Sequence, residues 1–242
     1  NNFINWYHCE KYGCMVEFKD SICIGKSRIC HVLRFLSHIV QSRRNTKYKL
    51  AFTWGIMIDS HCHLTYVENI DKEIEDCKSK GVKAVVTSAL SIDEGVKSLQ
   101  LRERYPDFVF VCLGLHPSDI DKFSGGQLEE YIEFIKQNRK NIVALGEIGL
   151  DYNWVTDKNK QEISKEIFLQ MIELARTLNM PLVIHSRNGR NESAISDALH
   201  MLEENNAKDV MMHCFSGNES NLKKALEQGY FISYATNICW TK

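Results

Sequence analysis

Residues 57–63, Met-Ile-Asp-Ser-His-Cys-His, begin as an apolar strand and end in two histidines separated by one residue. Residues two apart on an extended strand point to the same side, so His61 and His63 can share one metal ion. A lone His-x-His pair in a strand usually binds nothing. A metal-binding role is favoured for this pair because it lies at the end of the first of a series of similar apolar runs.

Seven such runs alternate with charged, helix-period segments from residue 57 onward. Each run is short and almost continuously apolar, as in strands covered on both faces. The runs span residues 57–61, 83–89, 108–115, 142–148, 182–185, 210–213 and 230–235. The predicted helices span residues 69–81, 92–105, 126–138, 160–178, 192–205 and 219–229. Strands joined by helices in this way form parallel sheets, because parallel neighbours need a long crossover.

The pattern fits either an open, doubly wound sheet or a closed barrel. A His, Glu or Asp lies at the C-terminal end of nearly every run. In a barrel these ends converge on one mouth, whereas an open sheet spreads them along a line. The sequence therefore predicts an α/β protein with a TIM-type (β/α) barrel, of which seven strands are present.

Glu147 lies inside the apolar run that ends Gly146-Glu147-Ile148-Gly149-Leu150-Asp151. A buried carboxylate needs a cation or hydrogen bonds, so Glu147 is either a salt-bridged core residue or a bridge between two metal ions. His185 and His213 each close a later run, and either one alone is as consistent with a hydrogen-bonded core histidine as with a ligand. Together, five residues occupy equivalent positions on four strands: His61, His63, Glu147, His185 and His213.

Nitrogen and carboxylate ligands without thiolates suit zinc, manganese or other divalent ions. Cys62 and Cys214 adjoin the histidines, but strand alternation turns each one to the opposite side. We expect both to pack as small apolar side chains.

Five sequence blocks, in order and spacing, resemble the signatures of TatD-type deoxyribonucleases over residues 57–242. The blocks are Asp59-x-His61-x-His63, Gly114-Leu115-His116-Pro117, Gly146-Glu147-Ile148-Gly149-Leu150-Asp151-Tyr152, Ile184-His185-Ser186-Arg187 and His213-Cys214-Phe215-Ser216-Gly217. The resemblance leaves residues 1–56 unmatched.

This resemblance implies a TIM barrel that hydrolyses DNA phosphodiester bonds, commonly as a 3′-to-5′ exonuclease acting on strand ends. It implies two divalent metal ions, Mg, Mn or Zn, at one dinuclear centre. His61 and His63 would hold one ion, His185 and His213 the other, and Glu147 would bridge them as the catalytic carboxylate. His116 and Arg187 would contact substrate, with Arg187 as a bidentate phosphate donor. Asp151 is either a structural cap or a functional group.

The sequence departs from the family at its C-terminal end. The expected closing block, an eighth strand running into Glu-Thr-Asp-x-Pro, is absent, and its aspartate would be a further metal ligand. Residues 57–242 number 186, against roughly 250 in a typical barrel. We therefore expect the last strand to lie beyond Lys242, in a longer product.

Two alternatives stay open. One is another His-x-His metal-barrel hydrolase acting on an amide, a lactone or a phosphotriester, although many of those carry a bridging lysine where this chain has Glu147. The other is a truncated remnant that keeps the motifs without activity, since an open barrel exposes strand edges.

Composition constrains the remaining properties. The 242 residues are 44% hydrophobic with a net charge of −1, which fits one large or two small globular domains and gives no sign of a nucleic-acid partner. The nine cysteines fit reduced thiols in a cytoplasmic protein better than a disulfide framework. No apolar run reaches the length of a membrane span, and a monomer is slightly favoured.

Residues 1–56 differ from the rest of the chain. Nine basic residues against three acidic ones give this segment a charge of +6, and it holds four of the nine cysteines. We interpret it as a basic, weakly ordered extension or a non-native N-terminal segment. A zinc site from His8, Cys9, Cys14 and Cys23 is the less favoured alternative, because its spacing matches no paired-cysteine module.

Overall fold

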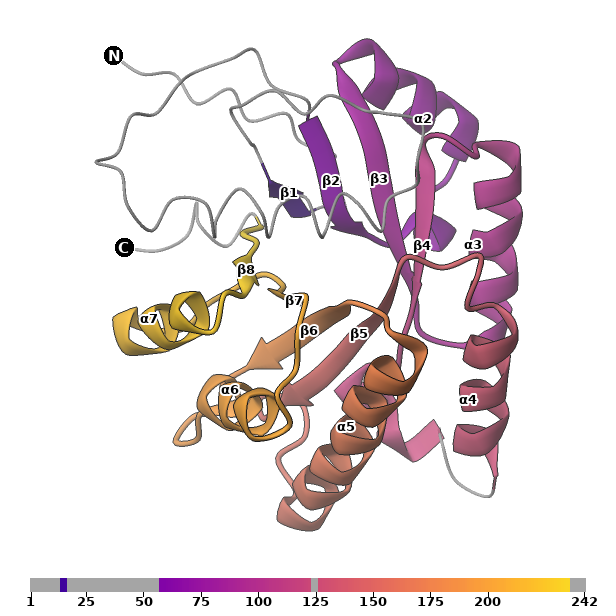
Figure 1. The fold of residues 1–242 in the computed structure, drawn as a ribbon. Helices are drawn as coiled ribbons and strands as arrows, with labels where there is room; N and C mark the ends of the chain where they lie inside the picture. The colour runs from indigo at the N-terminus through magenta and orange to yellow at the C-terminus, as the bar shows by residue number, and fades with distance from the viewer. Residues whose placement is uncertain (1–13, 17–56, 123–125, 236–242) are drawn as a thin grey trace, which may run out of the picture.

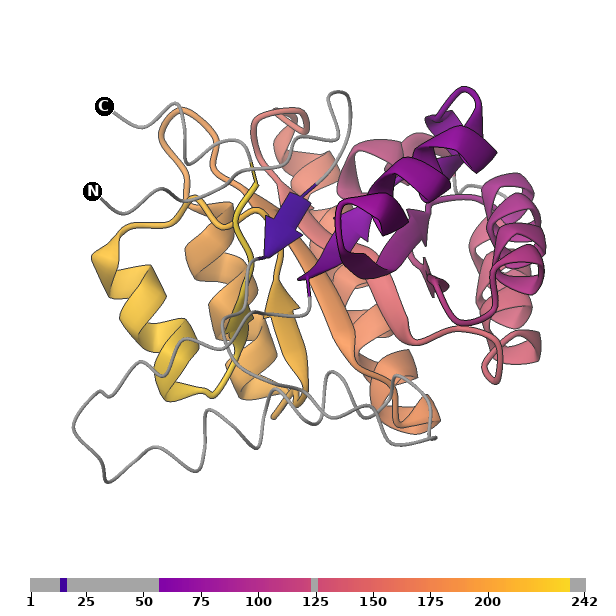
Figure 2. The same ribbon diagram turned by 90° about the horizontal axis from the view of Figure 1, so that it is seen from above.

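Seven strands run parallel in chain order in the computed structural model, which describes residues 14–16, 57–122 and 126–235. Each strand pairs with the next one along the chain. They are β2 (Met57–Cys62), β3 (Val82–Ala89), β4 (Val109–Leu113), β5 (Ala144–Asp151), β6 (Leu182–Arg187), β7 (Val210–Met212) and β8 (Phe231–Ile232). The sheet curls into a half-barrel (Figures 1 and 2). The predicted barrel architecture with seven strands is confirmed.

The helices lie on the outer face of the curled sheet (Figures 1 and 2). They are α2 (Ile70–Ser79), α3 (Ile92–Arg104), α4 (Gln127–Gln137), α5 (Lys158–Leu178), α6 (Ala194–Glu204) and α7 (Glu219–Glu227), with short 3₁₀ turns η1 (Leu64–Tyr66) and η2 (Pro117–Lys122). Ser91 and Asp157 cap α3 and α5 by accepting hydrogen bonds from backbone N–H groups of the first turn. Over the described part of the chain, no helix combines the length and apolarity that crossing a bilayer requires.

All the predicted strands and helices are present, with shifted ends. β5 runs three residues past the predicted end at 148, because Leu150 and Asp151 stay in register with Ser186 and Arg187 of β6. β8 covers two residues rather than the predicted 230–235.

The two edges of the half-barrel differ. Among the described residues, β8 pairs only with β7. At the other edge, β1 (Cys14–Val16) pairs antiparallel with β2, so backbone from the N-terminal segment covers the edge that the sequence predicted to be open. The remaining predictions for residues 1–56 lie outside the described residues.

A small apolar cluster fills the barrel interior beneath the mouth. Cys112, Ala144, Val183 and Met211 come from four successive strands and are buried together. Val183 and Met211 precede His185 and His213 by two residues, so strand alternation places each pair on the same side. This apolar layer therefore lies directly beneath the histidines.

Candidate metal centre

Glu147 lies at the centre of the site, on β5, with 4% of its surface exposed. Close contact between β4 and β5 fixes its backbone. A Cβ atom on Gly114 would lie 2.4 Å from the Gly146 carbonyl carbon and 2.7 Å from the Glu147 nitrogen. Glycine is therefore required at position 114 for Glu147 to take this position.

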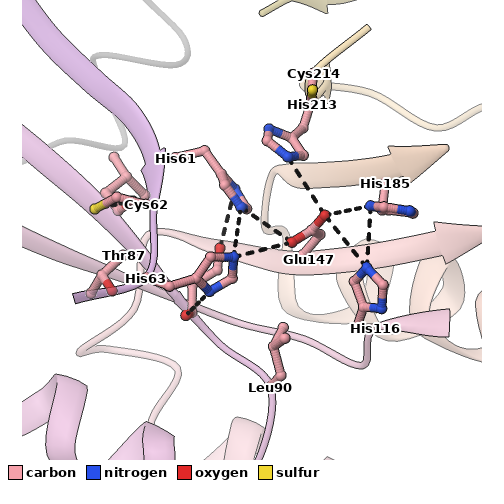
Figure 3. A network of polar contacts seen from close by, with 12 residues as sticks. His61, Cys62, His63, Thr87, Leu90, His116, Glu147, His185, His213 and Cys214 are labelled. Atoms are coloured by element: carbon pink, nitrogen blue, oxygen red, sulfur yellow. Dashed lines mark hydrogen bonds and ion pairs between the residues drawn. The ribbon is translucent and has the colours of Figure 1, made fainter. Parts of the chain in front are cut away.

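Five imidazoles surround the Glu147 carboxylate (Figure 3). They come from β2, the residue directly after β2, β6, and the loops after β4 and β7. Oε2 faces the β2 pair, and Oε1 faces the other three side chains. The distances are 3.1 Å to His61 Nε2, 3.6 Å to His63 Nε2, 2.6 Å to His185 Nδ1, 3.6 Å to His213 Nε2 and 3.8 Å to His116 Nε2. All five residues predicted as metal ligands therefore meet in one cluster at the barrel mouth, together with His116.

Ser88 on β3 orients the β2 histidines. The Ser88 carbonyl oxygen lies 3.1 Å from His63 Nδ1. A carbonyl only accepts, so His63 Nδ1 donates to it, and Nε2 is the ring atom that faces Glu147. The Ser88 Oγ lies 3.4 Å from His61 Nδ1, and the His61 ring stacks on His213 at 3.7 Å between centroids.

Asp151 orients His185. Its Oδ2 lies 2.8 Å from His185 Nε2, and a buried carboxylate accepts the Nε2 proton, which leaves Nδ1 to face Glu147. Its Oδ1 accepts from the backbone N–H groups of Asn153 and Trp154, each at 2.9 Å. The structure thus gives Asp151 both of the roles between which the sequence could not decide. Carboxylate–histidine pairs of this kind fix metal-ligating imidazoles in many proteins.

The two predicted substrate residues lie at different depths. His116, in the turn between β4 and η2, is partly buried, and its Nε2 lies 3.2 Å from His185 Nδ1. Arg187 ends β6, two residues beyond His185, and its side chain is exposed. His116 therefore belongs to the cluster itself, whereas Arg187 stands at its rim.

The charges of the cluster favour a cation. Burial alone raises the pKa of Glu147, but electrostatic interaction with His61 and His213 outweighs burial and holds that pKa well below its usual range. Burial and the neighbouring His185 lower the pKa of His116 to about 4, and burial with His61 lowers that of His213. Against burial, Asp151 and Glu147 raise the pKa of His185 to about 9. Against burial, Glu147 also raises the pKa of His63. The cluster therefore combines an anionic carboxylate with the neutral imidazoles of His116 and His213, the protonation states that metal ligands need, whereas His63 and His185 must lose a proton to bind a cation.

Two sets of side chains that share Glu147 could each hold a metal ion. Two groups of three residues, His61 with Glu147 and His213, and His116 with Glu147 and His185, each have ligand atoms within 4.8 Å of one another. Nitrogen and oxygen donors of this kind suit divalent cations. His213 faces the same Glu147 oxygen, Oε1, as His185 does. Its ligand atom nevertheless groups with those of His61 and Glu147 when the distances between ligand atoms are compared. The two criteria disagree, so the predicted assignment of histidines to ions stays a prediction.

Sequence reasoning missed Ser88 and left Asp151 undecided. Ser88 is a polar residue near the C-terminal end of an apolar strand, which was the available signal. The Cys62 thiol is buried and lies 3.5 Å from the Val86 carbonyl oxygen, as a packed side chain should. Cys214 is half-buried.

Comparison with known proteins gives a consistent result. The family described as TatD related DNase matches residues 58–242. A Bacillus subtilis protein named uncharacterized metal-dependent hydrolase YabD is 31% identical over 186 residues, covering 74% of this chain and 68% of its own. The human deoxyribonuclease TATDN3 is 31% identical over 193 residues, covering 75% and 69%.

A solved structure shares the fold. The TatD homologue YJJV from Escherichia coli k12 superposes with a TM-score of 0.63 at 25% identity, over 72% of this chain and 66% of that one. This chain therefore spans about two thirds of the length of the proteins it matches.

Proposed function

Because this chain is a metal-dependent hydrolase of the TatD related DNase family, we propose that it hydrolyses DNA phosphodiester bonds at a dinuclear metal centre, releasing nucleotides from the 3′ end of a strand. Among its relatives, the human protein is named a deoxyribonuclease and the Bacillus protein a metal-dependent hydrolase. These names support nuclease activity but do not define the substrate, for which the geometry of the site is the evidence.

One observation carries the proposal: the two oxygens of Glu147 face different histidines. Oε2 lies 3.1 Å from His61 Nε2, and Oε1 lies 2.6 Å from His185 Nδ1. A carboxylate that only accepted a hydrogen bond in the core would not gather five imidazoles around it. A carboxylate shared by two cations needs ligands on both of its sides, which is the arrangement found.

When bound, two divalent ions would activate a water molecule and neutralise charge on the scissile phosphate and its leaving oxygen. The residues of the chain hold and orient this centre. Glu147 fixes the spacing, Ser88 and Asp151 set the directions of His63 and His185, and no nucleophilic side chain is needed. His116, whose low pKa keeps it neutral, lies where a substrate oxygen would approach.

The low net charge favours binding of a short stretch of DNA at the site over binding along a long duplex. The net charge is −1, and a protein that tracks long DNA usually relies on many phosphate contacts. Arg187 at the rim can donate two parallel hydrogen bonds to one phosphate. Binding one strand end at the mouth requires no more than this.

The test uses the full chain and oligonucleotides labelled at either end. With Mg²⁺, Mn²⁺ or Zn²⁺ present, a 3′ label should be released at once, and a 5′ label should give a ladder of shortening products. Chelation with EDTA should stop both. A His61→Asn protein purified in parallel controls for contaminating nucleases.

Lactone, amide and phosphotriester substrates are assayed beside DNA. An enzyme that cleaves one of these and leaves DNA intact would contradict the proposal and place the chain in the neighbouring hydrolase group.

A further inference from the structure

Two exposed aromatic side chains lie in loops that immediately follow barrel strands. Tyr66 is 55% exposed and Trp154 is 68% exposed. The other large apolar side chains that the described part of the chain exposes are aliphatic and lie on the outer helices: Val96, Ile163, Leu169 and Leu226. Among the described residues, the large exposed aromatics thus lie at the end of the barrel that carries the metal centre.

Tyr66 is held beside the metal centre. It lies in η1, directly after β2, with its ring 6.1 Å from the His63 ring between centroids. Its hydroxyl donates to Glu94 Oε1 at 2.5 Å, and the other Glu94 oxygen accepts from the Leu90 backbone N–H at 3.0 Å. The ring is therefore anchored at its hydroxyl end while more than half of its surface stays in solvent.

Trp154 lies on a different side of the centre. It follows β5 by three residues, and its backbone N–H donates to the Asp151 carboxylate that orients His185. Two strands, β3 and β4, separate β2 from β5 in the curled sheet (Figure 1). Tyr66 is thus tied to the His61–His63 side and Trp154 to the His185 side.

We propose that Tyr66 and Trp154 are base-stacking residues that hold the nucleotides on either side of the scissile phosphate. This inference rests on the proposed function and adds residues that determine how the substrate is positioned. An exposed aromatic ring offers a nucleobase a flat apolar face of matching shape. Stacking accepts every base, so these residues would position DNA without reading its sequence.

Stacking of this kind should make the protein bind DNA that carries bases more tightly than DNA that lacks them. A base stacked in a duplex has both of its faces covered, so the rings can act only on a strand end whose terminal bases are unpaired. Loss of one stacking contact should weaken binding about tenfold, the effect typical of an alanine substitution at such a ring.

The first experiment measures binding without cleavage. Fluorescein-labelled single-stranded oligonucleotides are titrated with the full chain in EDTA, followed by anisotropy. One probe carries normal bases at its three 3′-terminal positions, and the other carries tetrahydrofuran abasic sites there. Wild type should bind the probe with bases about 10- to 100-fold more tightly.

Tyr66→Ala and Trp154→Ala should each remove about tenfold of this preference. Tyr66→Phe keeps the ring, loses only the hydrogen bond to Glu94, and should retain most of the preference. Ile163→Ala, which truncates an exposed apolar side chain on α5, should leave it unchanged. All three positions are exposed, so the melting temperatures of the four variants should stay near that of wild type.

The outcomes separate the two proposals. Equal binding of both probes by wild type, or an unchanged preference in both alanine variants, overturns the stacking inference whether or not the protein cuts DNA. A base preference that the alanine variants lose supports it, even if no cleavage occurs and the proposed nuclease activity fails. With metal and active enzyme, the same variants should raise KM for the probe with bases and leave kcat nearly unchanged.

Discussion

Asp151→Asn offers a sharp perturbation of the metal centre that leaves all the proposed ligands in place. The amide oxygen can still accept from the backbone N–H groups of Asn153 and Trp154, now made by Asp151 Oδ1 at 2.9 Å. Its NH₂ group cannot accept the proton of His185 Nε2, which is 2.8 Å from Oδ2. His185 then either loses this partner or shifts its proton to Nδ1, and Nδ1 is the atom that faces Glu147.

The magnitude follows from the loss of this partner. Replacing an outer carboxylate that orients a metal-ligating histidine typically lowers metal affinity ~10- to 100-fold, which corresponds to about 1.4–2.8 kcal/mol. The lost charge-assisted hydrogen bond is worth about 1.5–3 kcal/mol, because Asp151 is fully buried and the His185 side chain only 17% exposed. At roughly 2–4 °C per kcal/mol for a chain of this size, the metal-free variant should melt on the order of 3–12 °C lower.

Isothermal titration of Mn²⁺ into metal-free protein measures the affinity, and a thermal melt of the same preparation measures the stability. Asp121→Asn is the matched control, because the Asp121 carboxylate is 68% exposed and pairs with Lys160 on the surface. An Asp151→Asn protein whose Mn²⁺ affinity stays within twofold of wild type would refute the orienting role.

Three further predictions test other parts of the account. Gly114→Ala should lower the free energy of unfolding by about 3 kcal/mol or more in a denaturant titration, because the new Cβ would meet backbone at 2.4 Å. In the control Gly81→Ala the new Cβ meets no atom within 4 Å, so the φ of +91 alone should cost ~1–2 kcal/mol. Mn²⁺ at ~100 times its Kd should add about 2.7 kcal/mol of stability, and a melt that EDTA does not reverse would contradict this. Burial raises the pKa of the Cys112 thiol from 9.0 to about 12, so its contribution to stability is present below pH 9 and is lost as the pH rises through 12; mass spectrometry should find Cys112 alkylated by iodoacetamide at pH 8 only after unfolding.

The fold was predictable because its signal is local and repeated. Each strand is a short apolar run and each helix a charged periodic segment, so the order of elements follows from the sequence. Strand ends were less predictable, since β5 continues to Asp151 only through its register with Arg187 of β6. The pairing of β1 with β2 was not predicted at all, because three residues at 14–16 carry no periodic signal.

The ligands of the site were predictable, and their orientations were not. His61 and His185 each lie near the end of an apolar strand and Glu147 lies inside one, which the sequence shows directly. The contacts of Ser88 with the β2 histidines and of Asp151 with His185 depend on the registers of β2 with β3 and of β5 with β6. Those registers are set by tertiary packing, so no spacing in the sequence reveals them.

The proposed chemistry depends most on Glu147 as the bridge between two metal ions. The direct measurement is metal content per chain, together with the rate of release of a 3′ label, for wild type and Glu147→Gln. The amide removes the negative charge that both ions share, so wild type should hold two ions and the variant at most one. Its cleavage rate should fall by more than about 100-fold, with a melting temperature in EDTA that shows a folded protein. A Glu147→Gln chain that keeps two ions and near-normal cleavage would contradict the account.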